Sequence, residues 1–195
     1  MGFTKAVSLY VALVHHPVLN RKGEVIASAV TNLDLHDMAR SACTYDIPTC
    51  YVVTPLRDQQ ELAKSLIGHW CEGVGRELHP DRCRALERLR LVDSVFAARK
   101  EIEDEWGRAP TVWATSAQDY RQALTHRQAR EQLEASPSPC LLLFGTGWGL
   151  APSILDEVDG VLEAIPGING YNHLSVRCAA AILMDRLLSR ERSIS

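Results

Sequence analysis

The sequence has little of what marks a membrane protein or a strongly basic nucleic-acid-binding protein. No apolar run approaches the roughly 18 to 20 residues that a transmembrane helix needs. The net charge is −3, so the chain as a whole lacks a basic excess. Lysine is scarce, because most of the 21 basic residues are arginine, whose planar guanidinium pairs with phosphate through two hydrogen bonds. A GC-rich genome would favour arginine codons in the same way.

Cysteine and histidine usage gives no sign of a disulfide framework or a metal site. The six cysteines are widely spaced and include no C-x-x-C pair. His15 and His16 are adjacent, and adjacent residues of a strand point to opposite faces, so they would not bind one ion together. The first residues show no signal-peptide cleavage pattern. We therefore expect reduced thiols, no metal and a cytoplasmic protein.

The remaining composition is ordinary for a globular protein, with 46% hydrophobic and 23% charged residues. A chain of 195 residues is long enough to bury a core of its own. No internal repeat and no long linker divides it. We expect a single domain over residues 1–195.

Strand-like and helix-like segments alternate along the chain. Short apolar runs predict strands over residues 8–14, 51–53, 89–92, 111–114, 140–144 and 161–165. Helical spacing of apolar residues predicts helices over residues 34–44, 58–73 (with a capping box at 58–61), 94–106, 117–133, 154–158 and 172–190. This alternation predicts an α/β fold with a mostly parallel sheet and helices on both faces.

Ligands of open α/β sheets bind at the carboxyl ends of the strands, so the loops there are the first candidates for a site. One is the glycine loop 145–150, whose alternate glycines would allow close approach to backbone N–H groups that are free to donate. The others are the turn 165–170 and the polar segment 171–177 that opens the last predicted helix. Each also has a plainer interpretation, as a turn or a helix cap.

A fourth segment, residues 31–40, joins the first strand to the first predicted helix. Asn32 or Asp34 is a candidate helix cap there. Arg40 lies about two turns into the helix, where it either faces solvent or takes part in a site.

Together these segments resemble the SPOUT superfamily of S-adenosyl-L-methionine (SAM)-dependent RNA methyltransferases, and the resemblance covers nearly the whole chain. It looks closest to a small bacterial family of stand-alone SPOUT domains, some of them named by analogy to tRNA guanine-N1 enzymes. The matching stretches are TNLDLHDMARSACTYDI, LLLFGTGWGL and EAIPGINGYNHLSVRCAAAILMDRLL. Each motif alone is loose, and their order and spacing make the resemblance specific.

The resemblance implies roles for individual residues. Arg40, Asn32 and His173 fall at positions near the reacting group and are the implied catalytic residues, with Arg40 orienting an RNA phosphate or lowering the pKa of a hydroxyl. The implied cofactor-binding residues are Thr115, Ser116, Phe144, Gly145, Thr146, Gly147, Ile165, Gly167, Asn172, Leu174 and Ser175.

The sequence departs from the family patterns at three of these positions. Gly147 stands where one pattern has a Glu, and Ser175 replaces an Asn. Asn172 stands where the guanine-N1 enzymes have a catalytic Asp, and an Asn is not a competent general base.

The resemblance also implies a C-terminal trefoil knot, a homodimer, RNA as substrate, and methyl transfer to a base nitrogen or a ribose 2′-oxygen of tRNA or rRNA. Two other interpretations stay open at this point. One is a SPOUT-like module that binds RNA or SAM without turnover, motivated by the missing Glu and the substituted Asn. The other is a flavodoxin-like nucleotide-binding protein, supported only by the strand and helix alternation.

Overall fold

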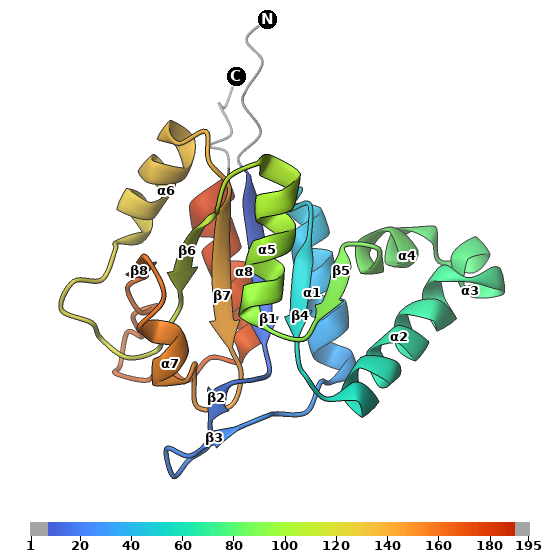
Figure 1. Cartoon of the computed structure of the whole chain (residues 1–195), viewed down its shortest axis with the longest axis horizontal. Helices are drawn as coiled ribbons and strands as arrows, with labels where there is room; N and C mark the ends of the chain where they lie inside the picture. The colour runs from blue at the N-terminus through green and yellow to red at the C-terminus, as the bar shows by residue number, and fades with distance from the viewer. Residues whose placement is uncertain (1–7, 190–195) are drawn as a thin grey trace, which may run out of the picture.

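A six-stranded parallel sheet forms the centre of the molecule (Figure 1), whose computed structural model describes residues 8–189. The strand order is β5-β4-β1-β7-β6-β8, and every pair of neighbours is parallel. The strands are β1 (Leu9–Val14), β4 (Cys50–Val53), β5 (Leu89–Val92), β6 (Thr111–Ala114), β7 (Cys140–Gly145) and β8 (Gly160–Val161). The expected α/β class is confirmed, whereas the trefoil knot and the domain limits of 1–195 stay predictions.

The central strand β1 shows why its sequence is a continuous apolar run. All six of its residues are buried, because helices cover both faces of the sheet. Leu9, Val11 and Leu13 pack into the core on one face. Tyr10 and Val14 pack into the core on the other face, as the two-residue period of a strand requires.

Helices divide between these two faces (Figure 1). Helices α1 (Asn32–Thr44), α6 (His126–Ala135) and α8 (Val176–Leu188) contribute apolar residues to the core that contains Leu9. Helices α5 (Val95–Trp106) and α7 (Pro152–Leu155) contribute to the opposite core. A two-stranded antiparallel ribbon of β2 (Val18–Leu19) and β3 (Val25–Ile26) follows β1.

Three helices form an arm that projects beyond the β5 edge of the sheet (Figure 1). They are α2 (Arg57–Cys71), α3 (Gly73–Leu78) and α4 (Pro80–Leu86). The predicted capping box is wrong, because α2 begins at Arg57 after Leu56, which makes no side-chain cap, and Asp58 lies inside the first turn. The cap of α1 is Thr31, whose hydroxyl accepts the Asp34 N–H, rather than Asn32 or Asp34.

Three other predicted boundaries are wrong, and all three concern segments beside one cavity. The helix predicted over residues 117–133 begins only at His126, where Thr125 and Gln128 form a capping box. The strand predicted over residues 161–165 is limited to Gly160–Val161. The helix predicted over residues 172–190 begins at Val176, and its predicted last residue lies outside the described residues.

Four other sequence expectations concern the cysteines, membrane-spanning helices, metal ligands and a signal peptide. All six cysteine thiols are free, and burial raises the pKa of Cys50 to about 12. Within residues 8–189, no helix is long and apolar enough to cross a membrane. The described part of the chain holds no group of three His, Cys, Asp or Glu residues placed to bind a metal ion. The amino-terminal residues examined for a signal peptide lie outside the described range.

Candidate functional site

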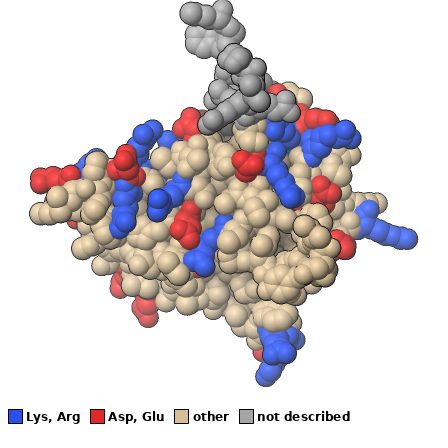
Figure 2. All heavy atoms as spheres, turned by 180° about the vertical axis from the view of Figure 1, so that it is seen from behind, with Lys and Arg blue, Asp and Glu red and all other residues tan. Residues whose placement is uncertain are grey.

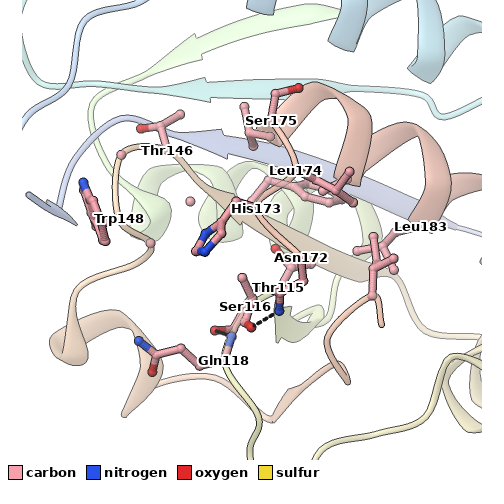
Figure 3. A pocket seen from close by; sticks show the side chains of 18 of the residues that line it. Thr115, Ser116, Gln118, Thr146, Trp148, Asn172, His173, Leu174, Ser175 and Leu183 are labelled. Atoms are coloured by element: carbon pink, nitrogen blue, oxygen red, sulfur yellow. Dashed lines mark hydrogen bonds between the residues drawn. The ribbon is translucent and has the colours of Figure 1, made fainter. Parts of the chain in front are cut away.

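A pocket of about 730 Å³ lies where β1, β6 and β7 end at their carboxyl edges. Three segments that follow different strands form its walls, and they converge in Figure 3. They are residues 115–118 after β6, residues 144–149 at the end of β7, and residues 163–176 ahead of and into α8. Ser28, Ala29 and Asp34 close the side next to β1 and α1. The size is that of a small-molecule site.

The glycine loop after β7 is held by the segment after β1. The Trp148 N–H donates to the Leu19 carbonyl (2.9 Å), and the Leu19 N–H donates to the Gly149 carbonyl (2.9 Å). Gly147 has a left-handed backbone (φ +59°), and a Cβ there would lie 2.8 Å from the Leu19 oxygen. The Gly149 N–H donates to the Thr146 carbonyl (3.1 Å), so the expectation that the N–H groups of the loop glycines are free to donate to a ligand is wrong for Gly149. The protein's own contacts therefore fix the loop before any ligand arrives.

A chain of hydrogen bonds ties the same loop to a buried histidine. The Thr146 hydroxyl donates to the Val14 carbonyl (2.9 Å) and therefore accepts from the Ser28 hydroxyl. The Ser28 hydroxyl then accepts from Nδ1 of His15 (2.9 Å), which must carry its proton there. His15 is 0% exposed, and burial lowers its pKa to about 4. A neutral His15 thus orients a serine on the pocket wall.

A second hydrogen bond joins two of the pocket walls. The Asn172 amide donates to the Ala117 carbonyl (2.8 Å), as the dashed line in Figure 3 shows. In the first of these walls, the Thr115 hydroxyl donates to the Leu143 carbonyl (2.9 Å), and the Ser116 hydroxyl accepts the Gln118 N–H (3.0 Å). The polar wall 115–118 is therefore ordered by its own hydroxyl groups and by Asn172.

Two acidic residues line the pocket, Asp34 from α1 and Glu163 from the segment after β8. Asp34 accepts the Thr31 hydroxyl and lies 3.4 Å from Nε of Arg177, with only 13% of its side chain exposed. Glu163 accepts the backbone N–H of His126 (2.9 Å), and the His126 imidazole lies 3.1 Å from the same carboxylate. Burial lowers the pKa of His126, against the effect of Glu163, which raises it. The pocket therefore carries negative charge held by neighbouring basic groups.

The structure gathers most of the sequence-predicted site residues around this one pocket. Those that line it are Thr115, Ser116, Phe144, Gly145, Thr146, Gly147, Ile165, Asn172, His173, Leu174 and Ser175. Ser175 is also the cap of α8, where its hydroxyl accepts the Cys178 N–H (3.3 Å). Gly167, Asn32 and Arg40 are not among the lining residues, and Arg40 is exposed in the middle of α1.

Sequence reasoning missed four polar residues of the pocket wall, Ser28, Asp34, Gln118 and Glu163. Ser28 lies in a segment with no helical or strand pattern, so no periodicity signalled it. The sequence indicates Asp34 only as a candidate helix cap, and the partner that holds it, Arg177, comes from α8. Glu163 falls within the strand predicted over residues 161–165, and Gln118 falls within the helix predicted over residues 117–133. The T-x-x-Q pattern at Thr125 indicates a helix start there, which leaves the preceding segment as a loop that could line a pocket.

The fold and the position of the pocket can be compared with those of solved structures. The Aquifex aeolicus TrmH/SpoU tRNA modifying enzyme superposes with a TM-score of 0.60 at 13% identity, covering 95% of this chain and 76% of that one. At this identity the likeness concerns the fold alone. The chain has the α/β fold of SpoU-type methyltransferases, with a ligand pocket at the carboxyl ends of its strands.

Sequence comparison then places the chain within that class. A family model described as SAM-dependent RNA methyltransferase matches residues 8–189, and the chain belongs to this family. An uncharacterized protein of Aquifex aeolicus is 35% identical over 95% of this chain and 90% of its own length. A Nitratidesulfovibrio vulgaris protein named tRNA (guanine-N(1)-)-methyltransferase is 48% identical over 93% of this chain, which spans 42% of that protein's length.

The pocket has the features that the family's cofactor, SAM, requires. Its volume is adequate for a nucleoside with an amino-acid tail, and its apolar lining includes Ile165, Leu174 and Leu183. The hydroxyls of Ser28 and Ser116 and the exposed backbone of the glycine loop offer polar partners. The Asp34 and Glu163 carboxylates are suited to the positive charges of the sulfonium and the amino group.

Proposed function

We propose that this chain transfers a methyl group to a nucleotide of tRNA, and that the pocket of Figure 3 holds both the cofactor and the reacting nucleotide. The observation that carries the proposal is the convergence of three separate post-strand segments on one pocket inside a SAM-dependent RNA methyltransferase family. The name of the Nitratidesulfovibrio relative supports tRNA as the substrate. A tRNA substrate also supports a cytoplasmic location for this protein.

Bound SAM supplies an electrophilic methyl group, so the protein has to orient a nucleophile and remove its proton. We assign the role of proton acceptor to His173, whose exposed imidazole lies on the pocket wall. Asp34, held by Arg177, also lines the pocket, and its carboxylate favours the developing positive charge on that imidazole. Asn172 and Ser116 keep the wall beneath the nucleotide in place. The catalytic roles implied for Asn32 and Arg40 stay predictions.

We also propose that the chain forms a homodimer through the rim of this pocket. Large apolar side chains concentrate there: Trp148, Tyr171 and Leu174 are exposed, and Ile168 makes almost no contact within the chain. Single exposed apolar residues are common, but a group of them at one rim indicates a covered surface. Light scattering after size exclusion should give twice the chain mass, and an Ile168→Glu, Tyr171→Ser variant should give a monomer. A monomeric wild type contradicts this proposal.

The activity test incubates the purified chain with deuterated SAM and an unmodified tRNA pool, then measures methylated nucleosides by mass spectrometry. Incorporation of label at a ribose oxygen or at a ring nitrogen supports the proposal and identifies the atom. SAM binding without incorporation would instead favour a non-catalytic module. His173→Gln should lower kcat by about 10²- to 10⁴-fold, the usual contribution of a general base, with little change in S-adenosylhomocysteine affinity.

A pocket-filling variant tests whether the chemistry occurs at this site. Ala179 lines the pocket from α8, so Ala179→Phe adds bulk there while keeping a helical residue. We expect loss of S-adenosylhomocysteine binding and of methylation. Glu131→Phe on the solvent side of α6 is the matched control for an added phenyl ring and should bind normally. Equal binding by both variants would place the cofactor elsewhere.

A further inference from the structure

A group of aromatic rings and arginines lies where the arm meets α1, away from the pocket. Trp70 is at its centre, with the imidazole centroids of His69, His79 and His36 at 4.9, 5.5 and 5.9 Å from its ring. The Arg82 guanidinium lies 4.0 Å from the centroid of the indole ring. One side of Trp70 packs against the small core of α1 and α4, and the rest of the residue is partly exposed. We call His36, Arg40, His69, Trp70, His79 and Arg82 the Trp70 surface.

The positive charge on this surface is not balanced within the described chain. Burial lowers the pKa of His36, the charges of Arg82 and Arg40 lower it further, and Asp37 opposes them. Within residues 8–189, no carboxylate lies within ion-pair distance of either Arg82 or Arg40. Two guanidinium groups without an ion-pair partner, one of them stacked on an indole ring, are available to bind an anion.

Other arginines of the same region behave differently. Arg76 on the arm is 3.0 Å from Glu87, and Arg88 is 3.2 Å from Asp46. Their guanidinium donors are therefore already engaged. A guanidinium stacked on an indole keeps its in-plane N–H donors available and is held in one orientation, which suits phosphate recognition. Stacking against Trp70 thus orients the Arg82 guanidinium for phosphate binding.

From this arrangement we infer that the Trp70 surface binds the phosphate backbone of the RNA substrate, next to the nucleotide that enters the pocket. The inference rests on the proposed function and adds the RNA-binding face to it. Helix α1 connects the two places, since Asp34 lines the pocket and Arg40 follows six residues later, about 9 Å along the helix axis. In Figure 2, basic side chains lie over the arm end of the molecule, with acidic ones between them. Exposed imidazole and indole rings add surfaces on which bases stack.

The experiment measures binding of a fluorescein-labelled, unmodified tRNA transcript by anisotropy over a series of salt concentrations. Arg82→Ala and Arg40→Ala should each weaken binding about tenfold, the loss of one charged hydrogen bond. Each should also lower the slope of log K against log salt by about 0.7 to 0.9, the value for one lost phosphate contact. Arg82→Lys keeps the charge but loses planar stacking, so it should recover only part of the affinity. Arg76→Ala is the matched control on the same arm and should leave the slope unchanged.

Two further readouts separate the RNA-binding surface from the catalytic site. S-adenosylhomocysteine affinity should be unchanged in all four variants, because none of the substituted residues lines the pocket. If the Arg40→Ala, Arg82→Ala double variant keeps the wild-type slope and the wild-type KM for tRNA, the inference is overturned while the methylation activity stands. If the variants lose binding but the wild type transfers no methyl group, the surface is confirmed and the proposed function fails. A wild type that does not bind the transcript contradicts both.

Discussion

Replacing Gly147 with alanine tests whether the segment after β1 fixes the glycine loop. Two costs arise at this residue. A left-handed backbone at φ +59° costs a non-glycine residue about 1 to 2 kcal/mol. The added Cβ would also lie 2.8 Å from the Leu19 carbonyl oxygen, a backbone atom that cannot rotate away, and such overpacking costs about 1 to 3 kcal/mol more.

Gly23 provides the matched control for this substitution. It has a similar left-handed backbone, φ +79°, but a Cβ there has no neighbour within 4 Å. Both alanines stiffen the unfolded chain equally, which stabilises by about 0.4 to 1 kcal/mol, so the difference between the variants isolates the contact with Leu19.

Thermal melts of both variants give the magnitude directly. For a chain of this length, each 1 kcal/mol shifts the midpoint by about 2 to 4 °C, so Gly147→Ala should melt about 2 to 12 °C below Gly23→Ala. Calorimetric titration should also show weaker S-adenosylhomocysteine binding for Gly147→Ala alone. Equal midpoints and equal affinities in the two variants would refute the reasoning, because the loop would then move away from Leu19 at no cost.

Three other predictions concern the pocket and its supports. The pKa of His15 falls from 6.5 in the unfolded chain to about 4 when folded, so the unfolded state binds more protons between these values. Stability should fall by about 2 kcal/mol from pH 7 to pH 5 on this account, and urea titrations should show that a His15→Gln variant lacks this part of the loss. Asn172→Ala removes the bond to Ala117, so it should cost only about 0.5 to 1.5 kcal/mol in stability yet weaken S-adenosylhomocysteine binding several-fold; unchanged affinity would show that the two walls order independently. Arg177→Met leaves the mostly buried Asp34 unpaired and should destabilise by about 1 to 3 kcal/mol, and a double-mutant cycle with Asp34→Asn should recover part of this loss; strict additivity of the two changes would argue against the pair.

The strands were well predicted because burial on both faces leaves a simple mark in sequence. The runs at 111–114 and 140–144 are mostly apolar, and the structure places both inside the sheet, as β6 and β7, with limits within one residue. Two helix ends were equally readable: Ser94 caps α5, and Gly107 ends it in the left-handed conformation. Local chemistry alone specifies these features.

The wrong boundaries share a physical cause. Residues 117–125, 162–165 and 172–175 were predicted as parts of a helix or strand, but they lie outside the regular elements, and several of them line the pocket. Their backbones are satisfied by partners far away in sequence, as the Asn172 bond to Ala117 shows. Periodicity contains no information about such partners, so it extended each neighbouring element into the site.

The sequence by itself determined the α/β class, the central strands and two of the segments that form the pocket, the glycine loop after β7 and the polar segment ahead of α8, because each depends on local pattern and on the rule that parallel strands end at one edge. Only the tertiary structure decided which side chains meet. In the structure Asp34 contacts Arg177, and Ser28 contacts His15. Arg40 lies outside the pocket, on the surface near His36, and not near the reacting group as the resemblance implied. These are contacts between elements, set by how helices pack on the sheet, and no single segment of the sequence specifies them.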